Sequence, residues 1–231
     1  MDAYSTSEAG PARRSAIGPQ RVALARFLAS TRAEGPGERT ALWVQGCAIR
    51  CPGCFNPQLW TFRGGELVAP AELVERVLAA GTPGVTLLGG EPFDQAGALA
   101  EVAAGVRRAG RSVMTFTGYT RAGLRRAVDG GRDDVAALLA ETDLLVAGPF
   151  RADLVDADRP WVGSTNQEFV LLNDRFPELL DEVGRAPDRV EVTVDVTGRV
   201  AVNGWAQLDA LDELLASVGR PQPRRASAER R

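Results

Sequence analysis

Apolar residues are arranged along the chain in two alternating patterns. Short continuous runs predict buried strands over Arg39–Gln45, Gly84–Leu88, Ser112–Thr117, Asp143–Ala147 and Gln167–Leu172. Between them, apolar positions three or four apart predict helices over Pro70–Ala80, Ala96–Ala109, Arg121–Val128, Asp133–Ala140 and Phe176–Glu182. Such alternation is typical of parallel strands joined by helical crossovers. Because there are too few units for an eight-stranded barrel, we expect an α/β fold, a partial (β/α)6-type parallel barrel.

The pattern changes near residue 185 and at both ends of the chain. Two short alternating runs, Val190–Asp195 and Arg199–Val202, flank a Val-Thr-Gly turn and predict a β-hairpin. Leu208–Val218 has helical spacing. The two ends are polar and carry few apolar anchors. The predicted division is therefore a disordered lead-in over 1–20, a core over 21–184, a hairpin-helix appendage over 185–218 and an Arg-rich tail over 219–231.

Composition excludes several kinds of chemistry. The 231 residues include no histidine and no lysine. This rules out Ser-His-Asp and Cys-His catalysis, a Schiff-base lysine, a Walker-type phosphate loop and histidine-ligated metals. A formal net charge of -3 argues against a nucleic-acid or membrane-surface partner. Without an apolar span or signal core we expect a cytoplasmic protein. Any catalysis must then come from carboxylates, cysteines or a cofactor.

The three cysteines of the chain, Cys47, Cys51 and Cys54, lie within eight positions, on a loop that follows a predicted strand. Open α/β sheets and barrels place their active sites at such strand ends. A structural zinc site needs four protein ligands, so zinc would here require three thiolates and a water molecule. Three unrelated buried cysteines are a further alternative. The best fit is a four-iron cluster with one iron left open for another ligand.

The spacing Cys47-x3-Cys51-x2-Cys54 resembles the signature of radical S-adenosylmethionine (SAM) enzymes. The resemblance implies a [4Fe-4S] cluster whose open iron binds SAM, so that cofactor-borne radical chemistry replaces the missing acid–base side chains. The run Gly89-Gly90-Glu91-Pro92 after the next strand resembles the Gly-Gly-Glu motif of that superfamily, which holds the amino group of SAM. An ordinary strand-to-helix turn is the alternative interpretation of this run.

Further motifs resemble the anaerobic ribonucleoside-triphosphate reductase activating proteins, which are glycyl radical enzyme activases. They are Cys-Pro-Gly-Cys-Phe-Asn at 51–56, Thr-Gly-Tyr at 117–119, Gly-Pro-Phe at 148–150, Gly-Ser-Thr-Asn-Gln at 163–167 and Glu-Gly-Pro-Gly-Glu-Arg at 34–39. The chain departs from the family pattern at two positions, since Phe55 replaces a tyrosine and Ala147 replaces an aspartate.

The resemblance implies an enzyme, a radical SAM oxidoreductase of the activating type, which forms a glycyl radical on a partner enzyme. Its implied partners are SAM, a reductant such as flavodoxin or ferredoxin, and a glycyl radical enzyme. Radical modification of a small molecule or peptide is an alternative, and a non-catalytic iron–sulfur or zinc module is another. The three cysteines are the expected metal ligands, and no catalytic side chain is assigned beyond them. The expected cofactor-binding residues are Gly53, Cys54, Phe55, Asn56, Gly89, Gly90, Glu91 and Thr117.

Overall fold

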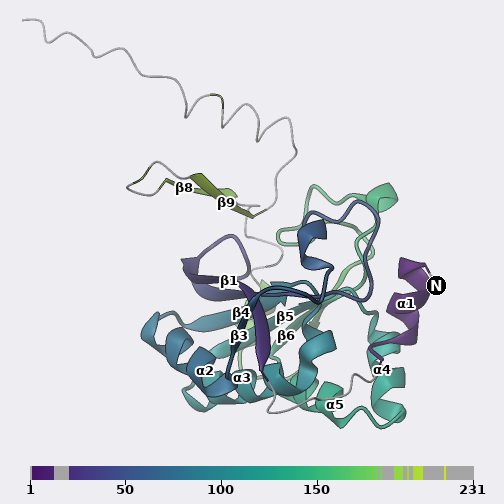
Figure 1. The fold of residues 1–231 in the computed structure, drawn as a ribbon, viewed down its shortest axis with the longest axis horizontal. Coiled ribbons are helices and arrows are strands. Elements are labelled where there is room, and N and C mark those ends of the chain that lie inside the picture. The colour runs from purple at the N-terminus through teal and green to yellow at the C-terminus, as the bar shows by residue number, and fades with distance from the viewer. Residues whose placement is uncertain are drawn as a thin grey trace, which may run out of the picture.

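A seven-stranded sheet forms the centre of the protein in a computed structural model, which describes residues 2–12, 21–181, 183, 190–194, 197, 200–204 and 216. Its strand order is β3-β1-β2-β4-β5-β6-β7 (Figure 1). The strands are β1 (Val22–Thr31), β2 (Arg39–Val44), β3 (Glu66–Val68), β4 (Gly84–Gly89), β5 (Ser112–Thr117), β6 (Leu144–Ala147) and β7 (Glu168–Leu171).

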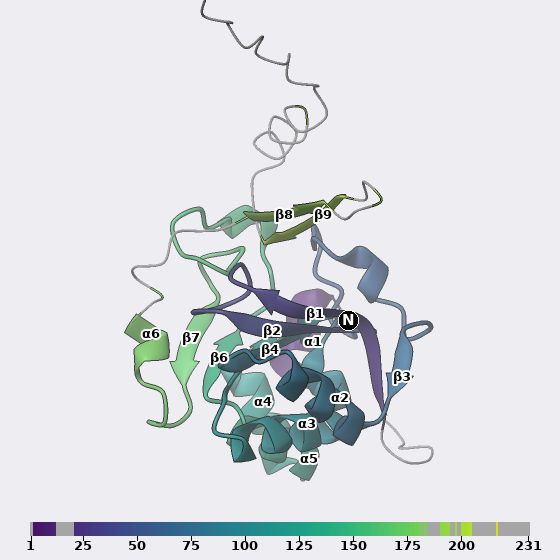
Figure 2. The same cartoon turned by 90° about the vertical axis from the view of Figure 1, so that its left-hand side faces the viewer.

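The four central strands, β2, β4, β5 and β6, are parallel neighbours. Their residues are almost all buried, as expected for parallel strands covered on both faces. The helices that connect them are α2 (Pro70–Ala79), α3 (Ala96–Arg108), α4 (Arg121–Asp129) and α5 (Asp133–Ala140). They gather on one side of the sheet (Figure 2). The predicted α/β class is thus confirmed.

The outer strands make the sheet mixed, which the sequence did not predict. β1 pairs antiparallel with both β2 and β3, and β7 pairs antiparallel with β6. β1 escaped prediction because it is only partly buried and carries Arg26, whose guanidinium lies 4.7 Å from the centre of the Trp43 ring. β3 is three residues long, too short for a periodic signal. Closure of the sheet into a partial barrel stays a prediction.

The segment expected as a disordered lead-in contains a helix, α1 (Ala3–Ala9). The side chain of Asp2 caps it by accepting a hydrogen bond of 2.8 Å from the Ser5 backbone N–H. The helix packs on α4, where Ser7 is buried and a Cβ at Gly123 would lie 2.4 Å from the Ser7 carbonyl oxygen. The missing side chain at position 123 therefore lets two backbones meet, which composition alone does not reveal. Residues 13–20 of the lead-in lie outside the described residues.

The predicted C-terminal hairpin is confirmed as β8 (Val190–Val194) and β9 (Val200–Gly204). It lies on the opposite side of the sheet from α2, α3 and α5 (Figures 1 and 2). The carboxylate of Glu191 accepts hydrogen bonds from the Thr31 hydroxyl and, at 2.7 Å, from the Arg32 backbone N–H. Of the predicted helix over Leu208–Val218, all but residue 216 lies outside the described residues, as does the tail over 219–231. The predicted domain boundaries stay a prediction.

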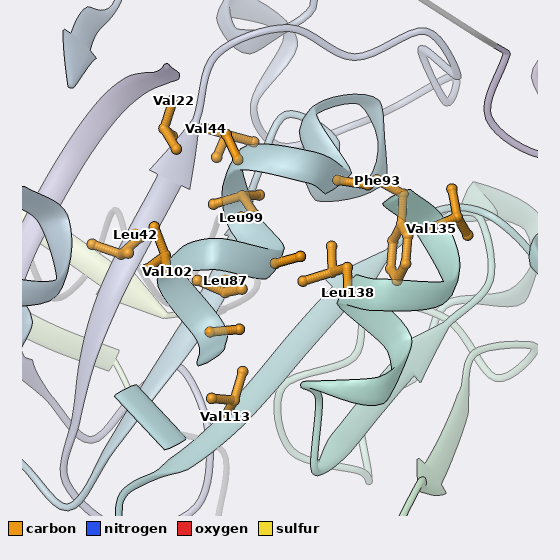
Figure 3. Packing of buried hydrophobic residues seen from close by; sticks show 14 of the residues in the cluster. Val22, Leu42, Val44, Leu87, Phe93, Leu99, Val102, Val113, Val135 and Leu138 are labelled. Atoms are coloured by element: carbon orange, nitrogen blue, oxygen red, sulfur yellow. The ribbon is translucent and has the colours of Figure 1, made fainter. Parts of the chain in front are cut away.

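The main core lies between the sheet and the helices. Leu99 and Val102 of α3 lie beside Leu42 and Leu87 of the central strands (Figure 3), and all four are fully buried. This packing fixes the strands against α3 and so sets the positions of the loops that leave their carboxyl ends. Among the described residues no helix is both long and apolar enough to traverse a bilayer.

Arg39 ties the strands together at the amino ends of β2 and β4. Arg39 is 2% exposed, and its guanidinium donates to the Thr86 hydroxyl at 2.9 Å, the Val85 carbonyl at 2.7 Å and the Ser112 hydroxyl at 3.0 Å. Buried charged groups are retained where their hydrogen bonds are satisfied. The Glu-Gly-Pro-Gly-Glu-Arg run thus has a structural role at the end of the sheet away from the cysteines.

Candidate functional site

The three cysteines line one pocket at the carboxyl ends of the parallel strands. Cys47 and Cys51 are buried, and Cys54 is partly buried. The loops after β4, β5 and β6 complete the wall, so the structure brings the cysteines together with the Gly-Gly-Glu turn and Thr117. The lining residues are Cys47, Ile49, Cys51, Cys54, Trp60, Gly89, Gly90, Glu91, Pro92, Phe116, Thr117, Gly118, Gly148, Phe150 and Gln167.

Backbone hydrogen bonds hold the cysteine loop. The N–H of Gly46 donates to the Leu59 carbonyl at 2.8 Å, and the N–H of Cys47 donates to the Trp60 carbonyl at 3.3 Å. The N–H of Cys54 donates to the Cys51 carbonyl at 3.1 Å, closing a turn between these two cysteines. The loop is therefore anchored to η1 (Pro57–Leu59) and the residue after it, without using the thiols.

Three of the predicted cofactor-binding residues, Gly53, Phe55 and Asn56, lie on this loop but not in the described pocket wall. The N–H of Asn56 instead donates to the Cys54 sulfur at 3.4 Å. The ring of Phe55 is 53% exposed and contacts Phe150 with 5.2 Å between ring centres. Because Phe150 lines the pocket, Phe55 supports the wall from outside.

The Gly-Gly-Glu turn packs directly on the cysteine loop. The N–H of Gly90 donates to the Val44 carbonyl, and the N–H of Glu91 donates to the Gly46 carbonyl, both at 2.8 Å. Gly89 has a φ of 106°, a conformation that favours glycine. At Gly90 a Cβ would lie 2.3 Å from the Gly46 carbonyl oxygen. These glycines are therefore required by contact between two loops of the chain.

Glu91 is 1% exposed, and its carboxylate is held by donors from two elements. Oε1 accepts from the Phe93 N–H and the Thr117 hydroxyl, both at 2.9 Å, and Oε2 accepts from the Gly118 N–H at 2.8 Å. Burial, and then the nearby charge of Asp94, raise the pKa of Glu91 to about 8. The predicted site residues Glu91 and Thr117 are thus bonded to each other.

Asp94, which the sequence analysis did not name, and Tyr119, the last residue of the Thr-Gly-Tyr motif, connect this turn to the cysteine loop. Oδ2 of Asp94 accepts from the Ala48 N–H at 2.7 Å, and Oδ1 accepts from the Tyr119 hydroxyl at 2.8 Å. Burial, and then the charges of Asp94 and Glu91, raise the pKa of Tyr119, which keeps it a hydrogen-bond donor. The only sequence signal for Asp94 was its position two residues after the Gly-Gly-Glu-Pro run.

Gln95 makes a similar connection to the strand that precedes the cysteines. Its Oε1 accepts from the Ala23 N–H at 2.7 Å, and its Nε2 donates to the Gln45 carbonyl at 2.9 Å. It therefore links β1 to the end of β2. Its position directly before a predicted helix gave no indication of these partners, which are 50 or more positions away.

The Gly-Ser-Thr-Asn-Gln segment contributes Gln167 to the wall of the pocket. Oε1 of Gln167 accepts from the Gly163 and Ser164 N–H groups at 2.9 and 3.1 Å, and its Nε2 donates to the Gly148 carbonyl at 3.3 Å. Ala147, where the family pattern has an aspartate, is 2% exposed in the core. This segment fixes Gly148 and its neighbours, and Ala147 contributes no polar group.

The cysteine set suits an iron–sulfur cluster chemically. Burial, and then the charge of Glu91, raise the pKa of the Cys47 thiol to about 12, and burial raises that of Cys51 to about 11. Such thiols stay protonated at neutral pH until a metal centre displaces their protons. Within the described ranges, no three cysteine, aspartate or glutamate side chains are grouped so that they could hold a metal ion.

One polar atom of the wall also lacks a partner. Nε1 of Trp60 is buried and has no hydrogen-bond partner in the described part of the chain. Leaving a buried donor unsatisfied costs about 1–3 kcal/mol. The pocket itself is lined by three thiols, a donor set that suits an iron–sulfur cluster.

Comparisons with known proteins agree with an iron–sulfur cluster at the three cysteines. A family model described as "4Fe-4S single cluster domain" matches residues 33–170. The anaerobic ribonucleoside-triphosphate reductase-activating protein of Vibrio cholerae is 33% identical over 144 residues, which are 58% of this chain and 87% of that protein. Its namesake from Escherichia coli is 30% identical over 144 residues, 58% of this chain and 88% of that protein.

A second kind of activating enzyme matches more locally. The pyruvate formate-lyase-activating enzyme of Clostridium pasteurianum is 39% identical over 64 residues, 25% of this chain and 27% of that enzyme. The resemblance inferred from the motifs is confirmed. This chain belongs to the 4Fe-4S single cluster domain family and, within the radical SAM superfamily, groups with the anaerobic ribonucleoside-triphosphate reductase-activating proteins.

Proposed function

We propose that this chain is a radical SAM activating enzyme in which Cys47, Cys51 and Cys54 hold a [4Fe-4S] cluster. The observation that carries the proposal is that the three thiols and the Gly-Gly-Glu turn line the same pocket. Three thiolates leave one iron open, and an open coordination position is the mark of a reactive rather than a structural metal centre. When bound, the cluster and SAM supply reductive cleavage of the cofactor to a 5′-deoxyadenosyl radical that abstracts hydrogen.

In this proposal, the residues of the chain bind the cofactor and hold it in position. The Gly89–Glu91 backbone receives the amino group of SAM, and Glu91 stays fixed by Thr117 and the Gly118 N–H. The Gly53–Asn56 segment, on the outer side of the cysteine loop, contributes to the cofactor site next to Cys54. Ile49, Phe116 and Phe150 give the pocket apolar walls, which would limit the water around a reactive intermediate once the cofactor fills the pocket.

The target of the radical is proposed from the relatives. Their names describe activation of a ribonucleoside-triphosphate reductase and of pyruvate formate-lyase. We assign to this chain hydrogen abstraction from a glycine Cα of a partner enzyme, with flavodoxin or ferredoxin as the electron donor in the cytoplasm. Binding and cleavage of SAM are independent of which partner is used.

A small molecule or peptide is the second candidate substrate. Two features favour it, the hairpin β8–β9 bonded to residues 31–34 and the apolar Ala147 in place of an aspartate. The hairpin lies beyond the region matched by the family model, which ends at residue 170. These features depart from the family pattern that the motifs resemble, and neither belongs to the cysteine pocket.

Anaerobic reconstitution with iron and sulfide, followed by reduction and incubation with SAM, tests the proposal. We expect about four irons per chain and formation of 5′-deoxyadenosine, with both lost in Cys51→Ala. The matched control is Ser30→Ala on β1, which should retain both. A reduced four-iron cluster that leaves SAM intact would overturn the proposal. A glycyl radical signal by electron paramagnetic resonance (EPR) on a candidate partner would then separate the two substrate classes.

A further inference from the structure

Ser7 of helix α1 grips the turn over 117–120, which joins β5 to α4. The residue is 0% exposed. Its hydroxyl donates a hydrogen bond to the Gly118 carbonyl, and its own carbonyl accepts one from the Thr120 N–H at 3.3 Å. A serine hydroxyl in a helix commonly bonds to a carbonyl of the preceding turn. The hydroxyl of Ser7 instead reaches a residue 111 positions away, so it joins two distant parts of the chain.

The same turn forms part of the cysteine pocket, where Thr117 and Gly118 line the wall. The Gly118 N–H donates to Oε2 of Glu91 at 2.8 Å. A Cβ at position 118 would lie 2.8 Å from a side-chain carbon of Ile49, which belongs to the cysteine loop. Gly118 is therefore held at its N–H by Glu91 and at its carbonyl by Ser7, and it has no side chain of its own to fix it. Loss of either bond would let this part of the wall shift.

Contacts on either side of Ser7 hold it in this position. A Cβ at Gly123 would lie 2.4 Å from the Ser7 carbonyl oxygen, so the backbones of α1 and α4 meet without a side chain between them. The Arg126 guanidinium donates to the Glu8 carboxylate at 2.7 Å. Arg132, which is buried, donates to the backbone carbonyls at positions 11 and 12. The segment that carries Ser7 is thus attached to the core at several points.

We propose that Ser7 is a positioning residue for SAM, because its hold on Gly118 fixes the pocket wall against which the cofactor binds. The inference rests on the proposed function for the identity of the ligand. Residues 2–12 precede the region that the family model matches, which begins at residue 33, so this support comes from outside the matched core. The bonds that anchor Cys47 and Cys54 come from other residues. Ser7 therefore acts on the affinity for SAM and not on assembly of the cluster.

Ser7→Ala is the test, because it removes the hydroxyl and puts a stronger helix former in its place. The reconstituted variant should contain as much iron as the wild type. It should bind SAM about two- to tenfold more weakly, the range that one net hydrogen bond covers. The change that SAM causes in the EPR spectrum of the reduced cluster gives the dissociation constant. In turnover, the KM for SAM should rise by the same factor while kcat stays at the wild-type value.

Thr6→Ala is the matched control, because it removes a hydroxyl from the same helix. The Thr6 hydroxyl donates to the Asp2 carbonyl, a bond within the first turn of α1. Its loss should lower the melting temperature at most and leave the affinity for SAM at the wild-type value. Wild-type affinity in Ser7→Ala, at any melting temperature, would overturn the inference. So would an equal loss of affinity in Thr6→Ala, because general weakening of α1 would then be the cause.

A second measurement needs no substitution. Because coupling between two binding events is reciprocal, SAM must favour the attachment of α1 by the same factor by which α1 favours SAM. Adding SAM to the reconstituted wild type, with the cluster oxidised so that SAM stays intact, should slow hydrogen exchange of the α1 amides by about two- to tenfold. Exchange in the hairpin β8–β9, which bonds to residues 31–34, should not change.

Unchanged exchange in α1 would overturn the inference even if Ser7→Ala failed to assemble a cluster. A wild type that holds four irons without binding SAM would instead count against the proposed function.

Discussion

Gly90 lies against Gly46 so closely that a Cβ at position 90 would stand 2.3 Å from the Gly46 carbonyl oxygen. The same carbonyl accepts the Glu91 N–H at 2.8 Å. The Gly-Gly-Glu turn and the cysteine loop are therefore a single packed unit, although 43 residues separate these two positions in sequence (90 − 46 − 1). Displacing one loop displaces the other.

Gly90→Ala should accordingly impair cluster and cofactor binding together. The added methyl group meets backbone atoms that cannot rotate away, and overpacking of this kind costs about 1–3 kcal/mol. A shift of the loops by about 1 Å would lower the rate of SAM cleavage by about 10²-fold. Iron content and 5′-deoxyadenosine formation measure both effects.

Gly130→Ala is the control for this substitution. Gly130 ends α4 with a φ of -82°, and the nearest atom to its Cβ position lies 3.2 Å away. This variant should keep wild-type iron content and turnover. If Gly90→Ala behaved like Gly130→Ala, the packed unit would have no importance for the site.

Asp94 and Tyr119 give a second way to loosen the cysteine loop. Asp94→Asn keeps the shape of the side chain. It places an amide NH₂ group, itself a donor, against one of the two donors, the Ala48 N–H or the Tyr119 O–H. The loss of stability should be about 1–3 kcal/mol, with faster release of iron to a chelator. Tyr119→Phe should also lower the stability and speed iron release, but by less, since the hydrogen bond from the Ala48 N–H to Asp94 remains.

Asp129→Asn, on the exposed end of α4, is the comparison for both variants because it removes a carboxylate that makes no such bridge. Denaturant unfolding and the rate of iron release are the measurements. Iron release at the wild-type rate in Asp94→Asn would show that the bridge does not hold the loop.

The sequence was sufficient for the features that depend on local order. The central strands are continuous apolar runs because both faces are covered, and the cysteine spacing lies within one loop, so both were predicted. The partners of Asp94 and Gln95 come from other elements, so no local pattern could reveal them. The glycines at 89 and 90 were recognised, but their close packing against Trp43, Val44 and Gly46 was not.

The N-terminal helix was missed for a related reason. Its sequence is small and polar, and it is stabilised by contact with Gly123 rather than by an apolar face. The Ser7 hydroxyl also donates a hydrogen bond to the Gly118 carbonyl, and the N–H of Gly118 in turn donates to the Glu91 carboxylate. Helix α1 thus supports the residue that orients the proposed cofactor site, a relation visible only in three dimensions.

Gly123→Ala should separate α1 from α4. Its Cβ would lie 2.4 Å from the Ser7 carbonyl oxygen, so the helices must move apart at a cost of about 1–3 kcal/mol. Limited proteolysis should then cleave near residue 10 faster than in the wild type. Ala122→Ser, at an exposed position of the same helix, should change stability by less than about 0.5 kcal/mol and leave proteolysis unaffected.

Glu91 should make the metal-free protein less stable as pH rises. Its pKa in the fold is about 8, against 4.5 for an unperturbed glutamate, so between these values the folded chain binds the extra proton. Stability from this group is therefore complete below about pH 4.5 and is lost as pH rises through 8. The slope is at most about 1.4 kcal/mol per pH unit.

Glu91→Gln isolates this contribution, because glutamine does not titrate and occupies nearly the same volume. The buried thiols do not interfere below pH 8, since their pKa values in the fold lie near 11 and 12. Subtracting the unfolding free energies of the variant from those of the wild type, from pH 5 to pH 8, should give a difference that falls steadily. A difference independent of pH over this range would mean that Glu91 is already ionised in the fold, and that its three donors outweigh its burial.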